Sequence, residues 1–183
     1  WVQNLHVLSN SVAREINDQR QLMLAESGTL TTNYSKLLSN DLLKSAARNC
    51  SQTSAAANRA IEMHPGNQEF AFHSDVSLIR RIMINLVKNA VEASKEGEKI
   101  TLKASQLDDA WTFSVHNSAF IPIDDQYNLF KRSFSTKGQG HGLGLYSVRL
   151  LTEKYLKGTV TFESDPNQGT TFTITLQFGH FFL

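Results

Sequence analysis

Four glycines stand at alternate positions in the stretch F-S-T-K-G-Q-G-H-G-L-G-L, which runs from Phe134 to Leu145. A glycine-rich backbone lets N–H groups approach a phosphate chain that side chains would otherwise block. The residues that follow, 145–156, have apolar side chains at helical spacing, so the glycines lead into a predicted helix whose amino end favours anions. The pattern predicts a site for a nucleotide polyphosphate. The glycines are Gly138, Gly140, Gly142 and Gly144.

Polar side chains within and just before the glycine run could contact the terminal phosphates. Lys137 can place a positive charge on phosphate oxygens, and Ser135 and Thr136 can donate hydrogen bonds to them. His141 lies inside the run and is a further candidate phosphate contact. Taken alone, a lysine at this place would be an ordinary solvated surface residue.

The segment N-L-V-K-N-A-V-E-A, residues 85–93, belongs to a helix predicted over 76–94. Asn85 and Asn89 are four residues apart, so both side chains project from one face of that helix. Carboxamide oxygens are suitable Mg²⁺ ligands when phosphate oxygens and water complete the octahedron. The alternative is that both amides simply bond neighbouring backbone groups.

Gly169 and Thr170 precede a strand predicted over 171–176. A turn glycine before a strand is normally only a hairpin element. The pair becomes functional if the threonine hydroxyl reaches a ligand.

The elements that must position these residues follow from the hydrophobic pattern. Apolar residues recur at helical intervals over 1–27, and residues 28–34 read as a linker. A second helix is predicted over 34–63, and Ser74 or Asp75 can cap the helix that begins at residue 76. Helices before bunched strands predict an α+β fold with the helices on one sheet face. The predicted strands are 69–72, 100–103, 111–115, 159–162 and 171–176.

Length and composition narrow the class of protein. A chain of 183 residues predicts one domain plus an appendage, and the net charge of +1 suggests contact with neither nucleic acid nor an anionic membrane surface. Cys50 is the single cysteine, so no internal disulfide can form, which fits a reducing compartment such as the cytoplasm. No apolar run is long enough to span a bilayer, and no signal peptide is visible.

Taken in order, the motifs resemble those of the GHKL ATP-binding superfamily, and within it the sensor histidine kinases, over about residues 37–176. The asparagine helix resembles the N box of that family, and F-K-R-S-F-S-T-K-G resembles its F box with a short ATP lid. G-Q-G-H-G-L-G-L resembles the G2 box, and G-T-T-F-T-I-T-L resembles the closing glycine-threonine motif and strand.

The resemblance implies a two-layer α/β sandwich, with a mixed sheet covered on one face by three helices and preceded by an N-terminal helix. Residues 1–33 would be the second helix of a dimerisation hairpin plus its linker, and 34–183 the ATP-binding domain. The implied cofactors are ATP and Mg²⁺, with Asn89 on the metal and with Asn85 and Lys137 in catalysis. The implied nucleotide-binding residues are Asn85, Lys88, Asn89, Asn117, Ser135, Thr136, Lys137, Gly138, Gly140, His141, Gly142, Leu143, Gly144, Leu145 and Thr170.

The residue type at Asn85 bears on the reaction. Relatives that hydrolyse ATP carry at this position a glutamate that activates water, whereas an asparagine is a poor general base at neutral pH. The resemblance therefore implies phosphotransfer from ATP to a histidine. Two alternatives stay open: a hydrolytic GHKL ATPase, and a pseudokinase that acts by protein interaction.

One family motif departs from the pattern. The G1 box normally reads D-x-G-x-G, and its aspartate reads the adenine amino group. The matching stretch here is V-H-N-S-A-F-I-P, residues 115–122, so that Asn117 stands where the aspartate should be and both glycines are absent. An asparagine oxygen can still accept from the adenine amine, but without the charge.

The resemblance also implies partners. His6 with Asn10 weakly resembles an H-x-x-x-N phosphoacceptor box, but residues 1–27 resemble the second helix of the hairpin. We therefore expect the phosphoacceptor histidine upstream of residue 1, in a parent protein that can be membrane-anchored. The expected partners are a response-regulator receiver domain and a second copy of the chain joined through the N-terminal helix, with no nucleic acid and no membrane contact by this part.

Overall fold

A computed structural model describes residues 16–17, 19–51, 56, 58–132 and 143–178, and it divides the chain into two units, 1–32 and 33–183. In the first unit residues 19–27 are helical. This helix ends where Gly28 takes a positive φ of 77° and the N–H groups of Thr29 and Leu30 turn back to Leu24 O, both at 3.1 Å. Within the described residues no helix is both long and apolar enough to cross a membrane.

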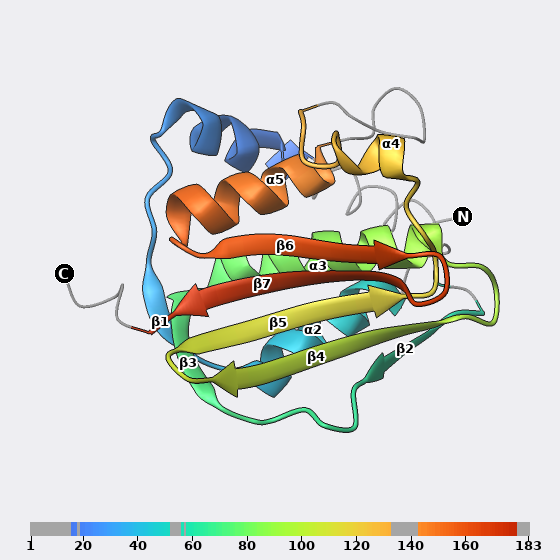
Figure 1. Ribbon diagram of the computed structural model, residues 1–183. Coiled ribbons are helices and arrows are strands. Elements are labelled where there is room, and N and C mark those ends of the chain that lie inside the picture. The colour runs from blue at the N-terminus through green and yellow to red at the C-terminus, as the bar shows by residue number, and fades with distance from the viewer. Residues whose placement is uncertain (1–15, 18, 52–55, 57, 133–142, 179–183) are drawn as a thin grey trace, which may run out of the picture. The chain divides into compact units, whose positions relative to one another are not determined.

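The second unit is built on a mixed five-stranded sheet, which confirms the predicted α+β class (Figure 1). The strand order is β2-β4-β5-β7-β6, with β2 parallel to β4 and every other neighbouring pair antiparallel. Helices α2, α3 and α5 pack against the sheet or against one another. The bounds are β2 Ala60–Met63, β4 Lys99–Leu107, β5 Ala110–Asn117, β6 Thr159–Asp165, β7 Gly169–Gln177, α2 Ser39–Ser51, α3 Val76–Ala93 and α5 Gly144–Leu150.

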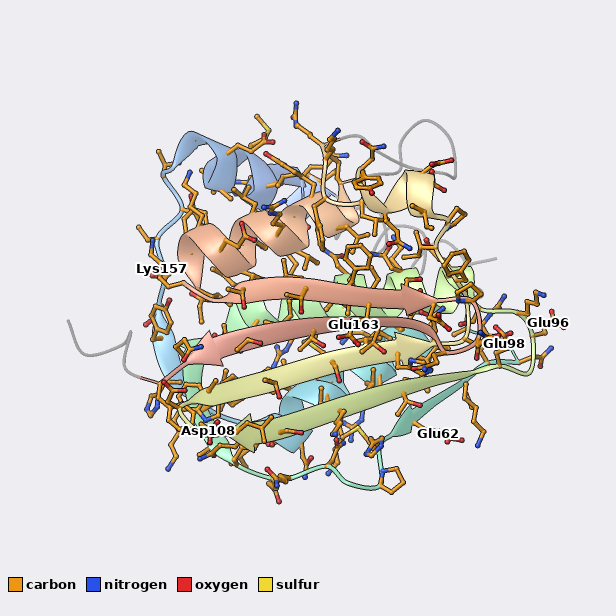
Figure 2. The ribbon with its side chains drawn as sticks, in the orientation of Figure 1. Glu62, Glu96, Glu98, Asp108, Lys157 and Glu163 are labelled. Carbon is orange, nitrogen blue, oxygen red and sulfur yellow. The ribbon has the colours of Figure 1, made fainter. Side chains whose placement is uncertain are left out.

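Side chains alternate cleanly between the two faces of the sheet. Phe113 on β5 pairs with Ile174 on β7, and both are fully buried toward the helices. The opposite face is lined by threonine and serine, and Glu163 lies on it (Figure 2). The turn residues Asp108 and Lys157 lie at one end of the sheet, and β5 finishes at the other end (Figures 1 and 2).

Helix α3 is the central helix of the layer and begins at a cap that the sequence predicts. Asp75 has extended backbone angles, and its Oδ1 accepts from Ser77 N at 2.9 Å and from Leu78 N at 3.0 Å. A cap of this kind stabilises a helix by about 1 kcal/mol. The apolar face of α3 is almost fully buried: Leu78, Ile79, Ile82, Met83, Leu86 and Val87 are at most 2 % exposed.

The helix predicted over 34–63 is wrong. Its first residues form strand β1, Tyr34–Leu38, and its last residues form β2, so among the described residues the α-helical part is α2. Strand β1 pairs antiparallel with β3, Ala71–Asp75, in a separate two-stranded sheet. The leucines of β1 continue the helical spacing of α2, and only the pairing with β3 makes the segment extended. The strand predicted over 69–72 is accordingly shifted to 71–75.

Two further local features differ from the sequence expectation. A short helix α4, Ile123–Gln126, follows the segment after β5 and was not predicted. The helix after the glycines begins at Gly144, but its second half, Leu151–Tyr155, is a π-helix that closes with Leu156 N donating to Leu151 O at 3.0 Å. The wider turn ends the helix directly before β6.

Candidate functional site

Asn85 joins helix α3 to the beginning of α5. Its Nδ2 donates to Ser147 Oγ at 2.9 Å, and Ser147 Oγ donates in turn to Gly144 O at 2.8 Å. Because the single hydroxyl proton of Ser147 goes to Gly144 O, the Asn85 amide must present its nitrogen to Ser147. The Asn85 oxygen is therefore the atom left to face a ligand, and it can only accept.

Asn89 lies one turn further along the same face of α3, as its spacing predicts. Both polar atoms of its amide lie 3.8 Å from the place where a Cβ of Gly144 would be, so the amide lies against the first turn of α5. The Asn89 Nδ2 is buried and finds no hydrogen-bond partner among the described residues. An unpaired buried polar group costs about 1–3 kcal/mol. The amide is therefore placed as if to bind a group that the described residues do not supply.

The first turn of α5 follows directly from the predicted glycine loop. Leu143, Gly144 and Leu145 are half-buried, and no side chain caps the helix start at Leu143. The other predicted phosphate-contacting residues lie outside the described residues. They are Ser135, Thr136, Lys137, Gly138, Gly140, His141 and Gly142.

Phe130 fixes the chain shortly before that loop, as predicted. Its ring lies 6.0 Å from the ring of Phe162 on β6 and 6.3 Å from that of Phe172 on β7, centre to centre. The guanidinium of Arg149 on α5 lies 5.8 Å from the centre of the Phe130 ring. The entrance to the loop is thereby packed onto the sheet and onto α5. Phe134, which we expected to pack in the same way, lies outside the described residues.

Asn117 ends strand β5 on the helix-covered face of the sheet. It continues the buried row of Phe113 and Val115, and it is only 3 % exposed. Its Nδ2 is buried and, like that of Asn89, has no hydrogen-bond partner in the described part of the chain. The structure thus puts a polar amide with an unpartnered nitrogen at the end of an otherwise apolar row.

A chain of hydroxyl groups holds the segment that follows Asn117. Ile121 N donates to Ser164 Oγ at 2.9 Å, the hydroxyls of Ser164 and Thr170 are 2.7 Å apart, and Thr170 Oγ1 donates to Ala119 O at 2.7 Å. Since the proton of Thr170 goes to Ala119, Ser164 must donate to Thr170. We call this series, from Ile121 through Ser164 and Thr170 to Ala119, the hydroxyl relay.

The hydroxyl relay changes the expected role of Thr170. We expected its hydroxyl to contact the nucleotide, but the residue is 1 % exposed and gives its proton to Ala119 O. Sequence reasoning missed Ser164, whose partnership follows from its register opposite Thr170. It also missed Ser147, whose signal is its position three residues after Gly144, on the α5 surface that meets α3.

Lys88 lies between the two asparagines in sequence and is exposed. Its charge is close enough to Cys50 on α2 to lower the pKa of that thiol, but burial outweighs it and raises the pKa from 9.0 to about 11. Glu92, one turn along from Lys88, raises the pKa further. The Cys50 thiol is thus a protonated group that contacts Ile84 O at 3.7 Å.

The carboxyl end of β5, the last turns of α3 and the first turn of α5 lie at the same end of the layers (Figure 1). This end holds the Asn85 oxygen and two buried amide nitrogens, those of Asn89 and Asn117, which have no hydrogen-bond partner among the described residues. No group of three or more histidine, cysteine or acidic side chains suited to a metal occurs among the described residues. Such a donor set suits a polyphosphate and a base better than a preformed metal cage.

Residues 74–180 match the model of a family described as histidine kinase-, DNA gyrase B- and HSP90-like ATPases. The sensor protein DegM of Bacillus sp. (strain B21-2) is 30 % identical over 127 residues, which cover 68 % of this chain and 34 % of DegM. The histidine protein kinase SaeS of Staphylococcus aureus (strain USA300) is 33 % identical over 129 residues, which cover 65 % of this chain and 36 % of SaeS. The chain thus spans about a third of the length of these curated relatives.

Solved structures have the same fold. The catalytic domain of histidine kinase ThkA superposes with a TM-score of 0.71 at 26 % identity, covering 80 % of this chain and 96 % of that one. ThkA in complex with the response regulator protein TrrA also superposes with a TM-score of 0.71, at 20 % identity, covering 94 % of this chain and 50 % of that one.

Proposed function

This chain belongs to the family of histidine kinase-, DNA gyrase B- and HSP90-like ATPases, and we propose that it is the ATP-binding catalytic domain of a sensor histidine kinase. In the proposed reaction the γ-phosphoryl group leaves the β-phosphate of ATP and bonds to a histidine nitrogen, with ADP as the other product. The observation that carries the proposal is the Asn89 amide. Its nitrogen is buried without a partner among the described residues, and the amide lies against the first turn of α5.

Asn89 suits the role of magnesium ligand that the resemblance assigns to it. A carboxamide offers one oxygen and one N–H₂ group, and rotation about its last bond exchanges them. Either end then meets a partner at a bound nucleotide, the oxygen on the metal or the nitrogen on a phosphate. Mg²⁺, when bound, would neutralise negative charge on the phosphates.

Asn85 directs the proposal toward phosphotransfer rather than hydrolysis. Its nitrogen is committed to Ser147, and its oxygen is an amide oxygen that does not take a proton at neutral pH. The Asn85 side chain therefore cannot act as a strong general base toward a nearby water molecule. The domain should bind ATP without hydrolysing it until a histidine accepts the γ-phosphoryl group.

The loop outside the described residues completes the proposed site. Lys137 would neutralise charge on the terminal phosphates in catalysis, and Ser135, Thr136 and His141 would contact the phosphates. The backbone at Gly138, Gly140 and Gly142 would approach the phosphates closely, as their lack of a Cβ permits. Phe130 packs the entrance of this loop onto the sheet, so that its beginning is fixed in place.

The proposal extends to partners. The phosphoacceptor histidine would precede residue 1, the N-terminal helix would join two copies of the parent protein, and the phosphoryl group would pass to a response-regulator receiver domain. Cys50 is the single cysteine and its thiol is protonated, which fits a cytoplasmic position. These roles rest on the resemblance and on the similarity to SaeS and DegM.

Phosphate release in saturating Mg-ATP tests the reaction type. We expect Mg-ATP at 100 times its Kd to stabilise the chain by about 2.7 kcal/mol, with phosphate release close to the uncatalysed background. Asn85→Glu supplies the missing base and should raise release without abolishing binding. Fast turnover in the unmodified chain would favour a hydrolytic ATPase, and absence of thermal protection would favour a protein-interaction module.

A further inference from the structure

We propose that Asn117 makes the base site accept guanine as well as adenine nucleotides. The inference rests on the proposed function, because it concerns the base end of the same nucleotide site. It starts from the burial of Asn117, which is 3 % exposed and lies on the same face of β5 as the buried Phe113 and Val115, at the end of the strand. A polar amide at that place costs free energy unless a ligand supplies its hydrogen bonds.

The amide of Asn117 differs from that of Asn85 in one respect that matters for recognition. Ser147 fixes the orientation of the Asn85 amide by accepting from its nitrogen. By contrast, Asn117 Nδ2 is buried with no hydrogen-bond partner in the described part of the chain. No bond of that nitrogen therefore selects between the two orientations of the Asn117 amide.

The two orientations match two purines. With its oxygen toward the base, an amide accepts from the N6 amino group of adenine while its nitrogen donates to N1. Turned over, its nitrogen donates to O6 of guanine while its oxygen accepts from N1–H. An ionised carboxylate in the same place only accepts. One of its oxygens can accept from the N6 amino group of adenine or from N1–H of guanine, but its other oxygen then faces adenine N1 or guanine O6, which are acceptors themselves. Asn117 is thus matched to either purine at two points, whereas an aspartate would be matched to either at one.

The backbone at Asn117 is held in place by its neighbours. The position of the amide group is therefore well defined, although the group itself can rotate. A Cβ on Gly169 would collide with Asn117 O and with the backbone of Ser118, which shows how closely the two strands approach there. The hydroxyl relay then holds Ala119 and Ile121 from the side of β6 and β7. The rotation that exchanges the amide oxygen and nitrogen is that about the terminal torsion of the Asn117 side chain.

Calorimetric titration of the full chain with Mg-ATP, Mg-GTP and magnesium tripolyphosphate tests the inference. We expect the Kd of Mg-GTP to lie within about tenfold of that of Mg-ATP, and tripolyphosphate to bind at least about tenfold more weakly than either nucleotide. Asn117→Asp removes the amide donor and should weaken Mg-ATP and Mg-GTP alike, each by about tenfold or more. Asn58→Asp makes the same charge change at an exposed residue with positive φ, and it should leave both affinities unchanged.

The outcomes separate the inference from the proposed function. Tight Mg-ATP binding with Mg-GTP more than about 100-fold weaker would overturn the inference and leave the ATP site intact. Equal affinity for tripolyphosphate and both nucleotides would also overturn it, because the base would not be read. Binding of neither nucleotide would overturn both. The comparison in the unmodified chain decides the matter even if Asn117→Asp fails to fold.

Discussion

The two halves of the candidate site are built by different means. In the α3–α5 half, Ser147 links Asn85 to Gly144, and the Asn89 nitrogen has no partner among the described residues. In the β5 half, the Asn117 nitrogen likewise has no partner in the described part of the chain, and the backbone around it is held by the hydroxyl relay. Each half thus combines a fixed support with one amide nitrogen that the described residues leave unsatisfied.

The difference between the halves lies in what the support fixes. In the α3–α5 half a side chain is fixed, because Ser147 determines which atom of Asn85 faces outward. In the β5 half the backbone of the segment 117–121 is fixed, while the Asn117 side chain is left to turn. On the proposed function, the phosphate end of the site would present one defined set of atoms at Asn85, whereas the base end would accept more than one purine.

The largest expected effect is that of Asn89→Ala on nucleotide affinity, which should fall without a loss of stability. Asn89→Ala should weaken Mg-ATP binding at least about 100-fold, or about 2.7 kcal/mol. Without nucleotide the variant should be no less stable than the parent, because it removes a buried amide nitrogen that has no partner. Calorimetry and thermal unfolding measure the two quantities, and Asn49→Ala on α2 is the matched control. A large loss of stability in Asn89→Ala with unchanged affinity would assign Asn89 to the fold.

The next effect concerns the backbone of the β5 half. Gly169 and Gly97 both have positive φ, 79° and 82°, but only Gly169 has backbone atoms where a Cβ would be, and Gly97 has nothing within 4 Å. Gly97→Ala should cost about 1 kcal/mol from the left-handed backbone alone. Gly169→Ala should cost about 3 kcal/mol or more, since strand and loop must also move apart. Denaturant unfolding measures both, and equal costs would show that the close approach to Asn117 is not a constraint.

A smaller effect tests the hydroxyl relay. Thr170→Val keeps the shape of the residue but leaves Ala119 O without its donor and Ser164 without its acceptor, at a cost of about 1–3 kcal/mol. Thr173→Val, on the open face of the same strand, should change stability by less than about 0.5 kcal/mol. Thermal unfolding compares the two variants. If both changes prove equally mild, the hydroxyl relay does not hold the segment.

The smallest effect concerns Cys50, which belongs to neither half. Burial raises the pKa of its thiol from 9.0 to about 11, so the group is protonated in the folded chain at neutral pH. Its contribution to stability is fully present below pH 9.0 and is lost as the pH rises through about 11. Alkylation by iodoacetamide at pH 8 should therefore be slow in the folded chain and fast in denaturant. A folded-state rate equal to that of free cysteine would contradict the burial.

The sequence predicts the parts of this fold that depend on local physics. Asp75 is a cap because of its type and of the apolar period that follows, and Asn85 and Asn89 share the α5-facing side of α3 because they are four residues apart. The strands β5 and β7 follow from strict alternation. None of these needs information from distant parts of the chain.

The parts that sequence reasoning missed depend on contacts between distant segments. Strand β1 is extended because β3 pairs with it, although its leucines continue the helical spacing of α2. The hydroxyl relay joins residues that are 43 and 51 positions apart, and only the strand register brings Ser164 opposite Thr170. The same register places the Thr170 hydroxyl where it donates to Ala119 O.

The most direct test of the central claim is calorimetric titration of the unmodified chain with ATP, with magnesium present and again with magnesium removed by EDTA. We predict saturable binding at one site per chain with magnesium, and much weaker binding without it. Absence of binding in both titrations would contradict the proposed nucleotide site, because the amide nitrogens of Asn89 and Asn117, which have no partner among the described residues, would then not be explained by a bound nucleotide.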